Sequence, residues 1–585
     1  MALTSYLPFS STTTPLQATT YLLGVSLFSI SFLVFLNSIL PFVITDLLGI
    51  EKGVGDIVGT LGFVDEIVAL IACPIWGLVS DRLGVRTVAV IGYSIIGLAL
   101  FLFVQAHNAY PQLLLARILF AVGATAATTM VTAILPSLTD ESSPPIPSAA
   151  APKPPAQNRH SVLSTSSEAT ITPERYRSQS NDSFHSSSSR REEVREAVAE
   201  DNNKPTTLAG YVGLFTGCGA LVALSLFLPL PARFGGLKDV TRAEAVKYSF
   251  YVVGAFALAV AVFVGIGLQN LRGEEGKGWR MLLGLRKTNP DGTGAVNDEV
   301  PKKNVVPYWH LLRESVVLGF IDSEIAIGYL GGFVARASTV ALSLFIPLFV
   351  SSFFIREGLC EGDPSEVLSK ECKAAYNLAA ALTGVAQLIG LICAPLFGYL
   401  SSRTGSSSIP LIIATTFGIA GYIAFPKLQS PEYKDKDGRG GSPVVFLLAA
   451  LIGISQIGAI VCSLGSLGRG VLKVDIVNVL VNHAGEEEGL VIERPDRGHE
   501  TAPLLERPDV VPEDTVSRVR LKGSVAGVYS WCGGAAILLL TKLGGYLFDS
   551  WTTGAPFYLM AIFNGLLLVA VLAIDLAKAV KSRSS

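Results

Sequence analysis

The chain has 585 residues, of which 50% are hydrophobic and only 16% are charged. A soluble protein of this length would carry about a quarter charged residues, so the composition argues against a string of ordinary soluble domains. The 45 basic and 47 acidic residues give a formal net charge of -2 and no basic excess, which excludes nucleic acid as an expected partner. The mean hydropathy is +0.50. The charges collect in a few polar blocks, and the rest of the chain consists of apolar runs of about 20 residues or more, as is typical of membrane spans.

Twelve such apolar runs follow one another along the chain. Each is long enough to cross about 30 Å of hydrocarbon as a helix. The runs are continuous and do not alternate between polar and apolar residues, which favours helices over membrane strands. Their approximate limits are 20–45, 55–79, 86–106, 110–137, 207–231, 248–270, 324–354, 374–401, 407–426, 443–467, 523–547 and 554–577.

An even number of spans places both termini on one side of the membrane. The long polar segments follow spans 4, 6 and 10 and therefore lie on that same side, which carries about 30 of the basic residues against about 12 opposite. This side is expected to be cytoplasmic. The expected organisation is 1–139 (spans 1–4), 140–206 (disordered loop), 207–270 (spans 5 and 6), 271–322 (linker), 323–467 (spans 7–10), 468–522 (disordered loop) and 523–585 (spans 11 and 12 with the tail).

The polar segments differ in character. The segment 140–206 is rich in Ser and Pro, and 468–522 is acidic, so both are expected to be disordered. The linker 271–322 contains VVPYWHLLRESVVLGFI, a pattern that predicts an amphipathic helix along the cytoplasmic interface.

An internal repeat relates the two halves of the chain. Span 2 ends CPIWGLVSDRLG and span 8 ends APLFGYLSSRTG, which pairs Gly77 with Gly398 at an offset of 321 residues. Spans 1 and 7 share LNSILPFVI and LSLFIPLFV, and spans 5 and 11 share AGYVGLFTGCG and AGVYSWCGG. A repeat of six spans keeps the membrane direction, so the axis relating the halves lies along the membrane normal. The predicted fold is an all-α membrane protein of two six-helix bundles related by pseudo-two-fold symmetry.

The segment GLVSDRLGVRT, between spans 2 and 3, resembles the signature of the major facilitator superfamily at the same place. The matching residues are Gly77, Asp81, Arg82, Gly84 and Arg86. Val85 stands where a second basic residue is usual. In span 4, RILFAVG is similar to a further motif of the family through Arg117 and Gly123, with Ala121 where Gly is common.

Span 5 is rich in glycine, as in the family's drug:proton antiporters, although the Pro of that motif is absent. The chain therefore most resembles the fungal-type, 12-span, drug:proton antiporter-like members. The resemblance implies a transporter that works by alternating access, with its substrate near mid-depth between the halves.

The signature residues are suited to a conformational latch. Gly77 allows close helix approach, and the partial positive charge at the start of span 11 could bind Asp81. Ser402 replaces the acid in the second half, so that latch is expected to be weaker. The alternative interpretation of Asp81 and Arg82 is a solvated turn.

Ionisable residues within spans are costly and normally face a cavity or a partner. Asp65 and Glu66 lie near the middle of span 2 and point about 100° apart on a helix. We expect one of them to carry a coupling proton, because a low dielectric disfavours the charged carboxylate. The alternative is a shallow, hydrated pair. Arg117 is a candidate partner for this proton coupling. Arg336, in span 7, could bind an anionic group of the substrate or pair with one of the acids.

Weaker candidates for cavity hydrogen bonds are Asn37, Tyr329, Gln387 and Gln456. Polar residues between membrane helices also serve simply to hold the helices together.

Two further patterns concern location. Glu500, Leu504 and Leu505 resemble the acidic dileucine signal by which adaptor complexes send proteins to vacuoles or lysosomes, the alternative being a chance match of a short pattern. The expected location is a vacuolar membrane or the plasma membrane. Cys360 and Cys372 share one predicted outer loop and are a candidate disulfide, the alternative being two free thiols.

The predicted function is secondary transport of a small organic solute, coupled to protons, with efflux or vacuolar loading favoured. The alternative is a non-transporting sensor or scaffold that signals through its long cytoplasmic segments. Neither a phosphate-binding loop nor metal-ligand spacing nor a nucleophile with its base stands out, so we expect no enzyme, catalytic residue, metal or cofactor. The expected partners are the solute, protons and the lipid bilayer, and the protein is expected to be a monomer.

Overall fold

The computed structural model describes residues 8–50, 54–140, 204–236, 240–272, 274, 277–282, 308–357, 373–404, 408–434, 440–487 and 521–584. Cys360 and Cys372 lie outside these residues, as do Glu500, Leu504 and Leu505. The disulfide and the sorting signal therefore stay predictions.

Within the described residues the chain forms helices and no strands, and twelve helical segments are long and apolar enough to cross a membrane. The prediction of twelve spans is confirmed. The segments are Pro15–Leu47, Ile57–Leu83, Val85–Phe103, Ala109–Thr139, Lys204–Phe234, Arg242–Gly267, Ser323–Arg356, Asn377–Arg403, Ser408–Lys427, Val444–Leu472, Lys522–Ser550 and Ala555–Val580.

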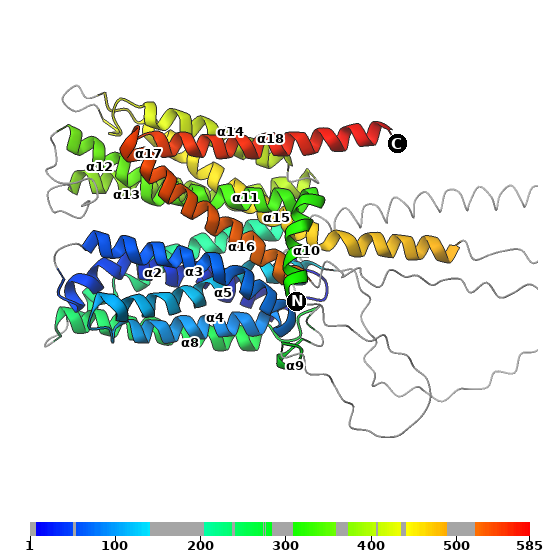
Figure 1. Ribbon diagram of the computed structural model, residues 1–585, viewed down its shortest axis with the longest axis horizontal. Helices are drawn as coiled ribbons and strands as arrows, with labels where there is room; N and C mark the ends of the chain where they lie inside the picture. The colour runs from blue at the N-terminus through cyan, green and yellow to red at the C-terminus, as the bar shows by residue number, and fades with distance from the viewer. Residues whose placement is uncertain are drawn as a thin grey trace, which may run out of the picture.

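The helices that build these segments are shown in Figure 1. Their bounds are α1 (Pro15–Thr19), α2 (Leu27–Phe42), α3 (Val54–Leu83), α4 (Val85–Phe103), α5 (Leu114–Thr139), α7 (Leu230–Phe234), α8 (Arg242–Gly267), α9 (Trp279–Leu282), α10 (Tyr308–Ile321), α11 (Ser323–Val340), α12 (Ile346–Arg356), α13 (Lys373–Arg403), α14 (Ser408–Ala424), α15 (Val444–Glu487), α16 (Lys522–Leu539), α17 (Gly545–Ser550) and α18 (Ala555–Ser584). Short π-helical stretches join the pieces of several spans, for example Ala341–Phe345 between α11 and α12.

Local sequence fixes several helix boundaries. Thr241 and Glu244 form a capping box at the start of α8, with the Glu244 amide donating to Thr241 Oγ1 at 3.2 Å. Asp322 caps α11 by accepting from the Glu324 amide at 2.9 Å. Gly84 separates α3 from α4 with a φ of +98°, a conformation that other residues rarely adopt.

One boundary differs from the sequence prediction. The disordered loop was expected from residue 468, but α15 continues to Glu487. The sequence VLKVDIVNVLVNH, after Gly470, contains neither Gly nor Pro and has closely spaced apolar residues, so nothing in it ends a helix.

The helices form two bundles, one from the first six spans and one from the last six (Figure 1). In the first bundle α4 packs against α5 and α8, and in the second α15 packs against α11, α13 and α14. The most extensive contact between the halves joins α3 to α16. We call the end at which α5 ends and α16 begins the loop end, and the opposite end the far end.

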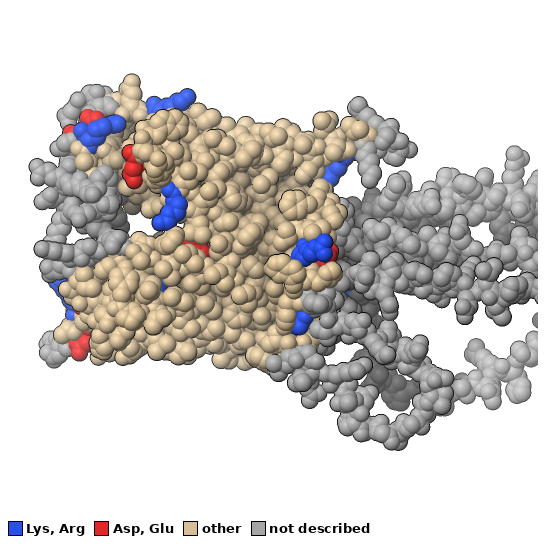
Figure 2. Space-filling model, viewed as in Figure 1, with Lys and Arg blue, Asp and Glu red and all other residues tan. Residues whose placement is uncertain are grey.

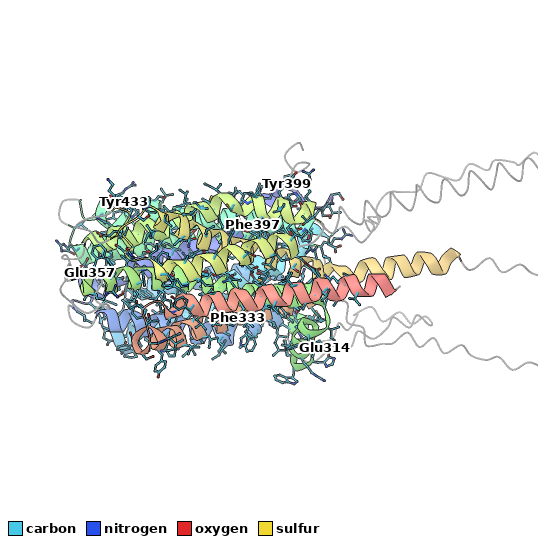
Figure 3. All side chains as sticks on the ribbon, turned by 90° about the horizontal axis from the view of Figure 1, so that it is seen from above. Glu314, Phe333, Glu357, Phe397, Tyr399 and Tyr433 are labelled. Carbon is cyan, nitrogen blue, oxygen red and sulfur yellow. The ribbon has the colours of Figure 1, made fainter. Side chains whose placement is uncertain are left out.

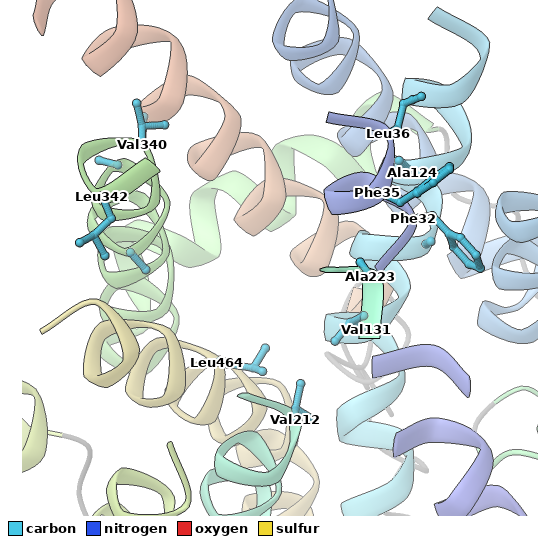
Figure 4. Packing of buried hydrophobic residues seen from close by; sticks show 14 of the residues in the cluster. Phe32, Phe35, Leu36, Ala124, Val131, Val212, Ala223, Val340, Leu342 and Leu464 are labelled. Atoms are coloured by element: carbon cyan, nitrogen blue, oxygen red, sulfur yellow. The ribbon is translucent and has the colours of Figure 1, made fainter. Parts of the chain in front are cut away.

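Apolar side chains fill both bundles and the contact between them. Figure 4 shows Phe32 and Phe35 of the first half and Val340 and Leu342 of the second within one buried cluster. On the outside, Figure 2 shows a broad belt almost free of charged atoms, with charges gathered near its ends and one acidic patch at mid-depth between the halves. Together with the twelve spans, this belt identifies an integral multi-pass membrane protein.

Candidate functional site

A buried ion pair lies within the first bundle, between α3 and α5. Arg117 is 1% exposed, and its Nε donates to both carboxylate oxygens of Asp65, at 2.9 and 2.8 Å. Its Nη2 donates to Asp65 and to Oδ1 of Asn37, on α2. The structure thus brings together three of the residues singled out from the sequence. The remaining nitrogen, Nη1, is buried and has no hydrogen-bond partner among the described residues.

Glu66 has different surroundings from its neighbour, as the helical geometry predicts. The charges that act on its carboxylate include those of Asp65 and Arg336, and Arg336 belongs to the other half of the molecule. Glu66 makes no hydrogen bond with any other residue that the structure describes. Its main opposite charge therefore lies across the contact between the halves.

Arg336 lies four residues before the end of α11, near the middle of the seventh span, Ser323–Arg356. A Cβ added to Gly533 of α16 would lie only 2.7 Å from Cγ of Arg336, so the glycine makes room for the arginine stem. The charge of Arg336 also acts on Tyr529 of α16, whose hydroxyl is 3.2 Å from that of Ser463. The second half thus places a cation whose charge acts on Glu66 of the first half.

Gln387 and Gln456 meet within the second bundle. Nε2 of Gln456 donates to Oγ1 of Thr339 at 3.0 Å, and Nε2 of Gln387 lies 3.5 Å from Oε1 of Gln456. Tyr329 lies elsewhere, because its hydroxyl donates to the carbonyl of Ser315 in α10 at 3.0 Å. The structure therefore places Tyr329 at the loop end, apart from the other cavity candidates.

At the loop end, Asp81 binds the first turn of α16, the start of span 11, where the partial positive charge of the helix end pointed to such a contact. Its carboxylate is buried and accepts from the amides of Gly523 (2.8 Å) and Ser524 (2.7 Å) and from the Ser524 hydroxyl. Charge-assisted bonds of this kind contribute about 1.5–3 kcal/mol each.

The backbones of α3 and α16 touch beside Asp81. A Cβ on Gly77 would lie 2.5 Å from the carbonyl oxygen of Gly523 and 2.9 Å from Cα of Gly527. The repeat-related glycines of α13 and the fifth span are equally close, since a Cβ on Gly398 would lie 2.8 Å from Cα of Gly210. Ser402, the counterpart of Asp81, donates its hydroxyl to Tyr399 in its own helix. The two halves thus close the loop end at two symmetric glycine contacts, of which one has a carboxylate.

The other signature residues have separate partners. The guanidinium of Arg82 lies 3.5 Å from the ring centre of Tyr308 in α10. Nε of Arg86 donates to the carbonyl of Gly265 at 2.8 Å. At Gly84 a Cβ would lie 2.6 Å from Oε2 of Glu274. The signature therefore connects α3 to α10, α4 to α8, and the turn between α3 and α4 to the segment that follows α8.

Glu274 is a site that sequence reasoning missed. It accepts from the amide of Val85 at 2.7 Å and lies 2.6 Å from Nζ of Lys522, which is 1% exposed at the start of α16. Nζ of Lys277 is 3.0 Å away. Burial acts to raise the pKa of the Glu274 carboxyl, but the charges and hydrogen bonds of Lys522 and Lys277 outweigh it and hold the pKa below its usual value. Glu274 and Lys522 fell in segments expected to be a linker and a disordered loop, where no periodic signal marks an ion pair.

Between the halves, towards the far end, lies an apolar groove of about 640 Å³. Its lining residues are Leu70, Trp531, Ala535, Leu538, Leu539, Lys542, Leu543 and Tyr546. Nζ of Lys542 lies 4.1 Å from the ring centre of Phe63, so the charged end of this side chain rests on the other half. Among the described residues no group of His, Cys, Asp and Glu is placed to hold a metal ion.

Comparison with known proteins agrees with this architecture. The family model for the Major Facilitator Superfamily matches residues 21–144. No curated protein matches the sequence.

Three solved transporters share the fold over nearly the whole chain. The proton:xylose symporter XylE, bound to 6-bromo-6-deoxy-D-glucose, has 12% identity and a TM-score of 0.51, covering 95% of this chain and 94% of its own. The transporter FucP in its outward conformation has 13% identity and a TM-score of 0.51, covering 95% and 99%. A bacterial homologue of the iron transporter ferroportin, in its outward-facing state, has 14% identity and a TM-score of 0.52, covering 96% and 99%. The fold of this chain is therefore that of the major facilitator transporters, with twelve membrane helices in two six-helix bundles.

Proposed function

We propose that this protein belongs to the major facilitator superfamily and is a secondary active transporter of a small organic solute, coupled to protons. The support is the shared fold together with the family match over residues 21–144. The glycines of the fifth span favour the drug:proton antiporter-like members and an efflux or vacuolar-loading direction.

The observation that carries the proposal is the arrangement of four charges within the spans. Asp65 pairs with Arg117 inside the first half, whereas Glu66 interacts with Arg336 of the second half. Placing a charged side chain in a span costs about 2.5–3.5 kcal/mol on insertion scales, so four of them near one level indicate a functional cavity.

Glu66 is the proposed carrier of the coupling proton. Asp65 keeps its counter-ion within its own bundle, so a rocking motion leaves that pair unchanged. The main opposite charge near Glu66 is on the other bundle, so separating the halves weakens the attraction that favours the charged form of its carboxyl group. Proton binding at Glu66 is therefore linked to the movement of the halves.

Arg336 is the proposed contact for an anionic group of the solute. A guanidinium binds a carboxylate or a phosphate through paired hydrogen bonds, and the charge of Arg336 already acts on the carboxylate of Glu66 in this conformation. The unpartnered Nη1 of Arg117 offers a second donor when the surrounding helices move.

The loop end supplies the gate of the alternating-access cycle. The glycine contacts and Asp81 hold the first turn of α16 against α3 in this conformation. Opening towards the loop end requires these bonds to break, and the lack of a carboxylate at Ser402 makes the second contact the weaker one.

Proteoliposomes with an inside pH indicator test the proposal. Solutes that drive proton movement through the wild-type protein identify both the coupling and the substrate. Glu66→Gln should keep solute exchange but lose its dependence on the pH gradient. Glu314→Gln, which removes an exposed carboxylate on α10, serves as the matched control and should behave like the wild type. Full pH dependence in Glu66→Gln would refute the assignment of the carrier.

The location is proposed from the sequence alone. With both termini in the cytoplasm, the acidic dileucine pattern would be exposed to adaptor complexes and direct the protein to a vacuolar membrane. Replacing Leu504 and Leu505 together by Ala should move a fluorescently tagged protein to the plasma membrane. An unchanged distribution would contradict the sorting role.

A further inference from the structure

The helix α10 carries the most exposed large apolar side chains in the described part of the chain. Phe320 is 87% exposed, Trp309 76% and Ile321 72%. Burying such a side chain contributes about 1.5–3 kcal/mol, so a 14-residue helix that leaves three of them uncovered is expected to have a partner.

The position of α10 restricts what that partner can be. Figure 1 shows α10 at the loop end, running across the direction of the spans. Figure 3 shows the helix that carries Glu314 projecting from the side of the bundle and not beneath it. Only Asp322 separates α10 from α11, which begins the seventh span. The last turn of α10 therefore lies at the level where this span enters the membrane.

The two faces of α10 have different roles. Leu311 and Ser315 are buried, and Leu311 belongs to a cluster with Ile325 and Val525 of the bundle. The face turned away from the bundle carries Trp309, Arg313, Val316 and Phe320, which recur at helical spacing and are all exposed. The bundle fixes the orientation of the helix through one face and leaves the other free.

We propose that the exposed face of α10 docks on the phospholipid at the loop-end membrane interface. Trp309, Val316, Phe320 and Ile321 insert between the first acyl carbons, and Arg313 reaches the phosphate groups. Tryptophan is enriched at this level of the bilayer, and a basic side chain set among apolar ones suits a headgroup region. The proposal does not depend on what the protein transports.

A docked α10 would also steady the closed loop end. Its inner face touches α11 and α16 of the second half, and Tyr308 stacks on Arg82 of the first half. Lipid that holds α10 in place therefore supports contacts on both sides of the gate.

Fluorescence quenching in nanodiscs of the full chain tests the proposal. The chain has five tryptophans, and the signal of Trp309 is the difference between the wild type and Trp309→Phe. With phosphatidylcholine brominated near the headgroup, the difference signal should be strongly quenched, and aqueous iodide should have little effect on it. Introducing Phe320→Trp into the Trp309→Phe protein moves the probe to the other end of the same face and should restore the lipid-quenched component.

Two results would overturn the proposal. A difference signal quenched by iodide but not by brominated lipid would place the face in water. A signal protected from both quenchers, in particles that contain two copies of the chain, would assign the face to a protein contact. Because Trp309→Phe replaces one exposed aromatic side chain by another, the variant is expected to fold, and its elution in detergent at the wild-type position checks this.

Discussion

The contact between Gly77 and α16 is tight enough that one added methyl group should open the loop end. In Gly77→Ala the new Cβ would lie 2.5 Å from the carbonyl oxygen of Gly523, whereas ordinary van der Waals contact begins at 3.4 Å. The nearest atoms, the carbonyl oxygen of Gly523 and Cα of Gly527, both belong to the backbone, so no side chain can move aside. The helices α3 and α16 must separate by most of an ångström at this level, which also stretches the bonds from Gly523 and Ser524 to Asp81.

Overpacking of this kind costs about 1–3 kcal/mol. If the cost falls on the closed state, the population of the open loop end rises about 5- to 150-fold. The amides of Gly523 and Ser524 donate to Asp81 in the closed loop end, and we expect opening to release them. Hydrogen exchange in the first turn of α16, followed by mass spectrometry in detergent, should therefore accelerate by that factor.

The same helix offers a matched control. Gly62 also lies in α3, and a Cβ added there would meet nothing within 4 Å. Gly62→Ala should leave exchange in α16 unchanged, and it should slightly stabilise the helix, by about 0.5–1 kcal/mol. Equal exchange rates in Gly77→Ala and Gly62→Ala would refute the reasoning that backbone contact holds this end closed.

Three further outcomes follow from the structure. Ser402→Asp adds the missing carboxylate of the second half. One charge-assisted bond of about 1.5 kcal/mol should slow hydrogen exchange at the start of the fifth span about tenfold. An unchanged rate would contradict the idea that the contact at Gly398 and Ser402 acts as the contact at Gly77 and Asp81 does. Asp65→Asn and Arg117→Met should each destabilise the protein by about 3–5 kcal/mol in denaturant titrations, whereas the double variant should lose less than the sum, and strict additivity would argue against the buried pair. The pKa of Glu274 is lowered in the folded state, so its contribution to stability is complete above the ordinary value of about 4.3 and is lost as the pH falls through the folded pKa. The melting temperature of Glu274→Gln should therefore fall less on acidification than that of the wild type. Parallel plots of melting temperature against pH for the two proteins would contradict this prediction.

The amino-acid sequence determines the layout of this protein because bilayer thickness acts on each span by itself. A run of about 20 apolar residues has no stable alternative to a helix in lipid, so the spans can be counted without knowing their neighbours. The repeat, which pairs Gly77 with Gly398, also fixes the relation of the two halves, since six spans restore the membrane direction. The contact of Asp81 with the start of α16 follows from the same repeat and the resemblance of its motif.

Only the tertiary structure decided which polar side chains meet. Asp65 and Glu66 are neighbours in sequence, but one carboxylate faces Arg117 and the other interacts with Arg336 on the opposite bundle. Helical geometry predicted that they diverge, not which cation each would find. Tyr329 looked like a cavity residue until packing placed it against α10.

The ion pair of Glu274 with Lys522 shows the same limit most clearly. The two residues are far apart in the chain and lie outside the apolar patterns that a hydropathy analysis detects. Ion pairs depend on the positions of single atoms within a few ångströms, whereas spans depend on summed transfer free energies over many residues. Sequence therefore fixes the elements and their direction, and the folded packing fixes the chemistry between them.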